Sequence, residues 1–253
     1  MAEGITSLKE PRFLVRPLRE VQEMSIGVDL QRRVWGYNES DIVPDEMFVV
    51  AKESGGQVFG AFHQNQPVGF ALAFAGTQHG MVYLHSHMVG VVPEYQNCGV
   101  GRLLKLAQRD NAIARGISLI DWTFDPLQLK NAHFNLARLG AIVRRYISNC
   151  YGRTSSPLHA GLPTDRLVAE WWVQSDRVRA LLSGKTNVPG PECLRISIPV
   201  EIRELCANNL PEAEKVQLCV REEFERHIAA GRTAVGFEFS GEQGSYLMKE
   251  HKE

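Results

Sequence analysis

The feature that most constrains this chain is a strand, a glycine loop and a helix in immediate succession. An apolar run rich in β-branched residues covers residues 82–92 and predicts a buried strand, which breaks at Pro93. After a short polar segment, Gly99 and Gly101 open a stretch whose apolar residues recur every three or four positions. That spacing predicts an amphipathic helix over residues 100–114. The segment is therefore expected to fold as strand, loop and helix.

Glycines where a helix opens leave backbone N–H groups unpaired and pointing the same way, at the positive end of the helix dipole. Such a place binds phosphate. The residues expected to offer an N–H group to a pyrophosphate, with Arg102 adding a positive charge, are Gln96, Asn97, Cys98, Gly99, Val100 and Gly101. The dipole contributes only ~0.3–1 kcal/mol per favourable charge, so hydrogen bonds would supply most of the affinity.

Two well-known phosphate loops do not fit this sequence. The P-loop needs Lys followed by Ser or Thr after its second glycine, whereas Gly101 is followed by Arg102 and Leu103. The dinucleotide fingerprint needs Gly or Ala three positions after Gly101, where this chain has Leu104, although Asp121 is available as its acidic residue. The loop therefore belongs to another class of phosphate site.

Composition narrows the kind of partner. The 253 residues allow one large core, or a core of ~150 residues with a second lobe. Apolar residues make up 44%, charged residues 23%, and the net charge is −1, so there is no basic surface for nucleic acid or membrane. We expect a small-molecule partner and a monomer or homodimer. The sequence has no apolar run near the ~18–20 residues that span a bilayer. Its first residues also lack the apolar core of a signal peptide. Both observations predict a cytoplasmic protein.

The five cysteines predict neither a metal site nor a disulfide framework. They are odd in number and none forms a Cys-x-x-Cys pair. Cys98 lies in the phosphate loop, but its position there favours a contribution from the backbone N–H rather than from the thiol. We therefore expect no metal cofactor.

The letters around the glycines carry a family resemblance. Residues 91–95 read Val-Val-Pro-Glu-Tyr, and residues 96–101 read Gln-Asn-Cys-Gly-Val-Gly. This segment resembles the acyl-CoA site of the GNAT acyltransferase superfamily, whose motif reads Gln/Arg-x-x-Gly-x-Gly/Ala after a strand ending in Val-x-Pro. The resemblance covers about residues 13–151. It implies a mixed α/β fold, with a largely antiparallel twisted sheet, two splayed central parallel strands and flanking helices.

The resemblance also implies roles for residues outside the loop. It implies that acetyl-CoA or another acyl-CoA is the co-substrate, with main-chain contacts from Val89 and Val91 to pantetheine and the acyl carbonyl. The helix that carries Asn131 and Phe134 and ends in a Leu-Gly turn resembles the superfamily's second cofactor-binding element. In the superfamily the first two helices and their link form the wall of the acceptor site, which makes Trp35, Tyr37 and residues 41–46 candidates there; surface loop is the alternative.

Periodicity and turn residues predict the other elements of the chain. We expect a domain over residues 1–174 and a C-terminal extension over residues 175–253 that packs on the core sheet or extends it. The expected strands cover residues 13–18, 58–63, 68–76, 119–124 (parallel to 82–92), 142–146, 167–173, 194–198, 233–239 and 245–248. The expected helices cover residues 20–35, a short stretch after Pro44, and residues 130–139, 175–182 and 209–230. The apolar face of the first helix is formed by Val21, Met24, Val28, Val34 and Trp35. Residues 184–191 read as a loop.

Acyl transfer needs an attacking amine, donors for the oxyanion and a proton for the leaving thiolate. His85 and His87 lie two residues apart, so their side chains share one face of the strand with Val89 and Val91. Histidines titrate near neutrality, and some superfamily members place a base at the position of His85. The alternative is a pair of histidines hydrogen-bonded within the sheet.

The sequence indicates less directly which residue donates the proton and which cation binds the acceptor substrate. The superfamily usually places a Tyr three residues before the Leu-Gly turn, where this chain has Leu136. Tyr146 or Tyr151 would take its place, or a thiol pKa of ~8.5 makes the acid dispensable. Arg144, Arg145 or Arg166 would hold a carboxylate on the acceptor or on a succinyl-type acyl group.

Three functions follow from these observations. The first is an acyl-CoA N-acyltransferase, acetyl by default, that acts on a small-molecule amine or amino acid by direct transfer in a ternary complex; a succinyl-CoA-type enzyme is its variant. The second is a non-catalytic acyl-CoA sensor, which Leu136 favours. The third is a nucleotide-binding switch that uses the same loop.

Overall fold

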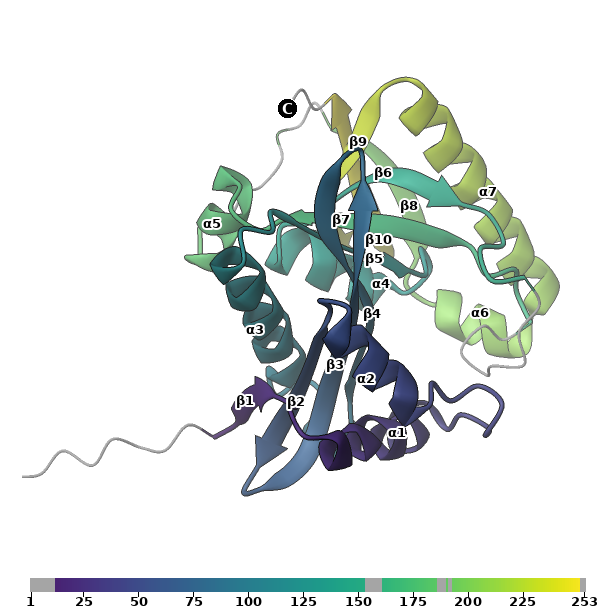
Figure 1. Ribbon diagram of the computed structural model, residues 1–253. Helices are drawn as coiled ribbons and strands as arrows, with labels where there is room; N and C mark the ends of the chain where they lie inside the picture. Colours follow the sequence, from purple (N-terminus) through teal and green to yellow (C-terminus); the bar gives the residue numbers. More distant parts are fainter. Residues whose placement is uncertain (1–11, 153–160, 186–189, 191–192, 251–253) are drawn as a thin grey trace, which may run out of the picture. The chain divides into compact units, whose positions relative to one another are not determined.

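The computed structural model describes residues 12–152, 161–185, 190 and 193–250 (Figure 1). Within them the chain forms two compact units, which we describe one at a time. The first contains the described residues up to 75 together with residues 88–110, and the second contains residues 76–87 together with the described residues from 111 onward. The predicted loop over residues 184–191 lies largely outside the described residues.

The first unit is a small antiparallel sheet covered by helices. Its strands are β1 (Leu14–Pro17), β2 (Gln57–His63) and the first ten residues of β3 (Gln66–Gln78), hydrogen-bonded in that order. Its helices are α1 (Val21–Trp35) and α2 (Asp45–Glu53), which pack against each other. One hydrophobic cluster fills the unit, built around Met24, Phe48, Phe70 and Leu104.

The first unit also holds the segment predicted from the glycine pair. The strand β4 (Met81–Val91) enters it at Met88, a short 3₁₀ turn η1 (Pro93–Tyr95) follows, and α3 (Val100–Ala114) begins at Val100. Gly116 follows the helix with a positive φ of 71°. The predicted strand, loop and helix are confirmed to within a residue or two.

The second unit is built on a longer sheet. Its strands are β5 (Leu119–Phe124), β6 (Ile142–Ile147), β7 (Arg166–Trp172), β8 (Leu194–Pro199), β9 (Arg232–Ser240) and β10 (Gln243–Glu250). They are hydrogen-bonded in the order β5, β7, β6, β9, β10, β8, and the first part of β4 precedes β5. The β4–β5 pair is parallel, with Leu84 opposite Ile120 and His85 opposite Asp121, and the rest are antiparallel. The predicted mixed, largely antiparallel α/β fold is confirmed.

The register divides this sheet into two unlike faces. Paired residues point to the same side, so Tyr83, His85, Asp121, Val168 and Glu170 share one face. The alternate residues are apolar and buried, and they include Leu84, Ile120, Leu167, Ala169 and Trp171. The buried face forms the core of the unit, and the other face is polar and partly open to solvent.

Helices complete the second unit. They are α4 (Leu129–Ala132), α5 (Asp176–Leu182), α6 (Ile202–Asn208) and α7 (Leu210–Ala229), and α7 packs on β6, β8 and β9 (Figure 1). A π turn, η2 (His133–Arg138), follows α4, and its Leu139 N–H donates to the carbonyl of Phe134 at 2.9 Å. The half-buried Arg177 of α5 donates to the carbonyls of Gly140, Leu136 and Val235. Burial lowers the pKa of Arg177 to about 10.

Three predictions of local structure need correction. The periodicity predicts Val21 on the apolar face of α1, but it is 59% exposed, and Gly27, Leu30 and Gln31 are buried with Met24 instead. Residues 130–139 were expected to form one helix, but the chain changes from α to π pairing at His133. The helix α6 was not predicted, because its sequence is short and rich in polar residues.

Candidate functional site

The glycine loop of the first unit has the backbone shape of an anion site. Asn97 and Gly99 both have positive φ angles, 58° and 88°, with Cys98 between them. Left-handed residues near a helix start turn successive N–H groups toward one point. The first helical bond of α3 runs from the Leu103 N–H to the Gly99 carbonyl at 3.0 Å, so the N–H groups before Leu103 are not used within the helix.

Two residues of this loop play parts that the sequence did not specify. The Gln96 N–H, one of the expected phosphate donors, donates to the Pro93 carbonyl at 3.2 Å, and its side chain donates to the Val91 carbonyl at 3.1 Å. Gln96 therefore fixes the turn between β4 and the loop. A Cβ added to Gly101 would meet only Val91 Cγ2, at 4.0 Å, so the space beside this residue is open. Arg102 is exposed at the same helix start.

The residues expected to line the acceptor wall lie together in the first unit. The rings of Trp35 and Tyr37 stack with centroids 5.3 Å apart, and Trp35 also meets Phe70 edge-on at 5.7 Å. The end of β4 touches this group, since a Cβ added to Gly90 would lie 3.1 Å from the Trp35 ring. Val89 and Val91 alternate with the buried Gly90 and are half-buried on the other face of the strand.

In the second unit, His85 forms a pair that the sequence did not reveal. Its Nδ1 lies 2.7 Å from Oδ1 of Asp121, the residue opposite it on the parallel strand β5. Asp121 is buried, with a side chain 7% exposed, while the His85 side chain is 30% exposed. Because an ionised carboxylate only accepts hydrogen bonds, the pairing places a proton on Nδ1. In the neutral ring, Nε2 is then a proton acceptor.

His87 stands beside this pair. Its ring centroid lies 6.2 Å from that of His85, so the two imidazoles share the face predicted from their spacing. The side chain reaches solvent, yet the protein around it disfavours the charged form, and His85 adds repulsion. Both effects lower the pKa of His87, so His87 is neutral at pH 7.

The two candidate tyrosines differ in their partners. The Tyr151 hydroxyl lies 2.8 Å from the Thr123 hydroxyl, and Thr123 follows Asp121 on the same face of β5. The Tyr146 hydroxyl instead donates to Asp165, which is fully buried and also accepts two bonds from Arg221 at 2.9 Å. Burial, with the neighbouring Asp165 carboxylate, raises the pKa of Tyr146 far above its usual range.

The second cofactor element lies on α4 and the π turn. Asn131 is exposed and Phe134 is half-buried. Leu136, at the position where the superfamily usually has a tyrosine, is fully buried, and its carbonyl accepts a bond from Arg177. This side chain faces the core and does not reach the open face of the sheet.

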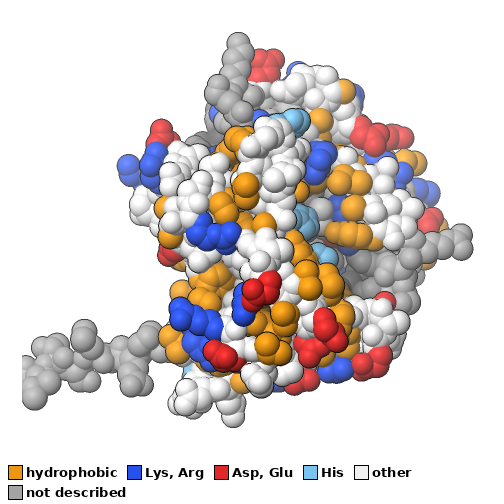
Figure 2. All heavy atoms as spheres, viewed as in Figure 1, with side chains coloured by type: hydrophobic (Ala, Val, Ile, Leu, Met, Phe, Trp, Pro, Cys, Tyr) orange, Lys and Arg blue, Asp and Glu red, His pale blue; other side chains and the backbone are white. Residues whose placement is uncertain are grey.

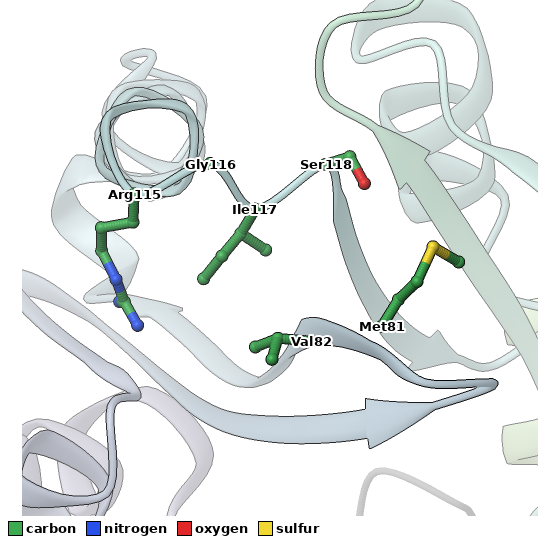
Figure 3. A pocket seen from close by; sticks show the side chains of 6 residues that line it. All are labelled: Met81, Val82, Arg115, Gly116, Ile117 and Ser118. Carbon is green, nitrogen blue, oxygen red and sulfur yellow. The ribbon is translucent and has the colours of Figure 1, made fainter.

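Two hollows lie at the start of β4. The first, of about 500 Å³, is lined by Met81, Val82 and residues 115–118 (Figure 3). Arg115 is its single charged residue and it has no acid or imidazole. The second, of about 320 Å³, lies over the polar face of the sheet and is lined by Tyr83, Asp121, Arg144, Arg145, Glu170 and Trp172 among others. Only the second hollow includes a member of the His85–Asp121 pair.

Arg144, a candidate for binding the acceptor, lines the second hollow but is already paired. It forms an ion pair with Glu170, which is also 3.4 Å from the Trp172 Nε1. Adjacent strand residues are predicted to point to opposite faces, and the two tryptophans do so: Trp171 is fully buried and Trp172 lines the hollow. Positively and negatively charged side chains are scattered over the face drawn in Figure 2, in keeping with the small net charge.

Comparison with known proteins agrees with this geometry. Residues 26–140 match the family described as "Acetyltransferase (GNAT) family". Similar solved structures include the ribosomal-protein-S18-alanine N-acetyltransferase from Escherichia coli, with a TM-score of 0.52 and 15% identity over 64% of this chain and 95% of that one. A putative GNAT acetyltransferase from Desulfovibrio desulfuricans has a TM-score of 0.51 and 14% identity over 64% and 99% of the two chains. Naa50 of Arabidopsis thaliana has a TM-score of 0.50 and 15% identity over 63% and 98%.

The curated proteins gave no match to the sequence. The fold, the glycine loop and the family match together define an enzyme of the N-acetyltransferase class. Residues 26–140 form a domain of the acetyltransferase (GNAT) family. Among the described residues, no helix has both the length and the apolar character needed to cross a membrane.

Proposed function

We propose that this protein transfers an acyl group, acetyl by default, from an acyl-CoA to a small-molecule amine in a ternary complex, with His85 as the general base. The observation that carries the proposal is the 2.7 Å contact between His85 Nδ1 and the buried Asp121 carboxylate. Such a carboxylate holds the ring in one tautomer and stabilises the imidazolium that forms when Nε2 accepts a proton.

The proton and bond changes can be assigned to residues of this chain. Nε2 of His85 accepts a proton from the amine, whose nitrogen forms a bond to the thioester carbonyl carbon while the carbon–sulfur bond breaks. The leaving sulfur takes a proton and departs as the free thiol. We assign this proton to Tyr151, whose hydroxyl touches Thr123 on the same face as Asp121, rather than to Tyr146, which is held by Asp165. His87, neutral at pH 7, is a second acceptor beside the base.

We propose that the pyrophosphate of CoA binds at the glycine loop. The N–H groups from Asn97 to Arg102 would bind the pyrophosphate, and the open space at Gly101 is where it would approach the backbone. The main chain at Val89 and Val91 would bind pantetheine and the acyl carbonyl, and Asn131 and Phe134 would contact pantetheine. The paired β6 and β9, with Val143 opposite Ala234, support a C-terminal extension that continues the sheet.

The proposal also specifies the identity of the acyl group and the kind of acceptor. A succinyl group is the runner-up to acetyl, with a cation such as Arg144 near its carboxylate. One similar structure contains the bisubstrate analogue CoA-Ac-MVNAL, and another is named for a ribosomal-protein alanine, so protein acceptors occur among proteins of this fold.

Turnover tests the proposal. Purified protein is incubated with acetyl-CoA or succinyl-CoA and a library of amines, and free thiol is measured together with the mass of the acylated product. We expect one thiol released per acyl-amine formed, and loss of both in His85→Gln. Binding of acyl-CoA without thiol release from any amine would contradict the enzyme and favour the sensor, for which the buried Leu136 at the family's tyrosine position is the supporting observation. Strong competition by ATP or NAD would instead favour the nucleotide switch.

A further inference from the structure

The hollow of about 320 Å³ over the polar face of the second unit has features that the proposed transfer chemistry does not use. Its volume lies at the lower end of the range for small-molecule sites. It touches the catalytic pair through Asp121, and its other walls come from the start of β4, from β6 and from β7. A molecule in this hollow would therefore lie next to the carboxylate that orients the proposed base.

The hollow contains two arginines and two acidic residues, and one residue of each kind forms an ion pair with the other. Arg144 and Glu170 neutralise each other through their ion pair, and Trp172 contacts the same carboxylate. The Asp121 carboxylate remains at the catalytic end. The Arg145 side chain is exposed and takes part in no ion pair or hydrogen bond within the described part of the chain. The hollow thus offers one anion and one available cation.

A bulge in β6 brings Arg145 to this face. Val143 pairs with Ala169 and Arg145 pairs with Val168, so Arg144 is the extra residue between them. Val168 shares its face with Glu170 and Asp121, and its partner Arg145 therefore points to the same side. Two strand spacings of ~4.8 Å separate β6 from β5, which sets the Arg145 backbone about 10 Å from the strand that carries Asp121.

The remaining walls are mainly apolar and aromatic, with Gln78, His79 and Ser118 as the polar residues among them. Met81, Val82, Leu119 and Val168 line the hollow, with the rings of Tyr83 and Trp172. Aromatic and aliphatic walls with a few fixed charges are typical of a site for an amphipathic small molecule.

We propose that the acceptor is an amino carboxylate with an apolar, ring-sized body, whose amine lies at the His85–Asp121 end and whose carboxylate binds Arg145. This inference rests on the proposed acyl transfer, because the base defines which end holds the amine. Arginine binds carboxylates through two parallel N–H bonds, and it therefore separates an acid from its amide or from the corresponding simple amine.

Three probes that differ only at the carboxylate test the inference on the full chain: L-phenylalanine, L-phenylalaninamide and 2-phenylethylamine. Binding of each is measured by calorimetry without CoA, and thiol release is measured with acetyl-CoA. We expect L-phenylalanine to have the highest kcat/KM, by about tenfold to a hundredfold. Arg145→Gln should raise the KM for L-phenylalanine by a similar factor, with little change in kcat and no change for 2-phenylethylamine. The control Arg179→Gln removes a cation whose side chain is 62% exposed on α5, and it should change neither.

The outcomes separate this inference from the proposed function. If amines are acylated but Arg145→Gln leaves the preference for L-phenylalanine unchanged, the acceptor assignment is wrong and acyl transfer stands. If no amine is acylated but L-phenylalanine binds in a way that depends on Arg145, the hollow binds amino carboxylates and the transfer reaction is wrong. A preference for peptides with free N-termini over all three probes would overturn the acceptor assignment.

Discussion

Replacing Asp121 with Asn removes the charge that orients His85 and changes almost nothing in shape. The hydrogen bond spans 2.7 Å and its acceptor side chain is 7% exposed, so it belongs to the charge-assisted, desolvated class that contributes ~1.5–3 kcal/mol. Since ~1.4 kcal/mol corresponds to a tenfold rate change, kcat/KM for the amine should fall about 10- to 150-fold. Thiol release at saturating acetyl-CoA measures the loss, and the affinity for CoA should be unchanged.

Two controls make this prediction refutable. Asp110→Asn removes an equal charge from a side chain that is 72% exposed on α3, and its rate should match the wild type. If Asp121 acts only through His85, adding Asp121→Asn to His85→Gln should cost no further activity. A rate within twofold of wild type for Asp121→Asn, or full additivity of the two substitutions, would refute the orienting role.

Other perturbations test the loop and the packing of each unit. Gly101→Ala should fold normally, because the new Cβ meets only Val91 Cγ2 at 4.0 Å, but it should weaken CoA binding in calorimetry by about tenfold or more. The Arg16 side chain lowers the pKa of Glu23 to about 2, so Glu23→Gln should lose stability that is present above about pH 4.5 and disappears as the pH falls through about 2. Since the Glu23 carboxylate is 21% exposed and screened by solvent, we expect a difference of about 1 kcal/mol in denaturant unfolding at pH 7, which decreases through pH 2 and vanishes below it. Arg177→Met should cost about 3 kcal/mol by leaving three carbonyls without their donor, and an unchanged unfolding midpoint would contradict this.

Local pattern was sufficient to predict most of the elements. The apolar run before Pro93 and the periodicity after Gly99 predicted β4 and α3, because both signals depend on neighbours in the sequence. The two-residue spacing of His85 and His87 likewise predicted their common face, which the ring distance of 6.2 Å is consistent with.

Long-range register could not be read from the sequence. The sequence offers Asp121 only as the acid of a dinucleotide fingerprint, because nothing local indicates that β5 pairs with β4 at His85. The extra residue at Arg144 reverses the alternation expected for β6, so that Arg145 shares the face of Val168. A bulge and a parallel pairing are set by the packing of the whole sheet, which a local pattern does not contain.

The π turn was missed for a related reason. Its sequence favours an ordinary helix, but Arg177 fixes the Leu136 carbonyl from a helix about forty positions away in the chain. This contact, together with the full burial of Leu136, explains why the residue at the family's tyrosine position faces the core.

The central claim is that His85 accepts the proton of the attacking amine. Chemical rescue tests it most directly: thiol release from acetyl-CoA is measured for the wild type and for His85→Ala, with and without added imidazole. We predict that His85→Ala lowers the rate by about 10²- to 10⁴-fold and that imidazole restores part of it in proportion to its unprotonated form. A variant that keeps the wild-type rate, or a rate lost in His85→Ala that imidazole leaves unchanged while CoA still binds, would contradict the account.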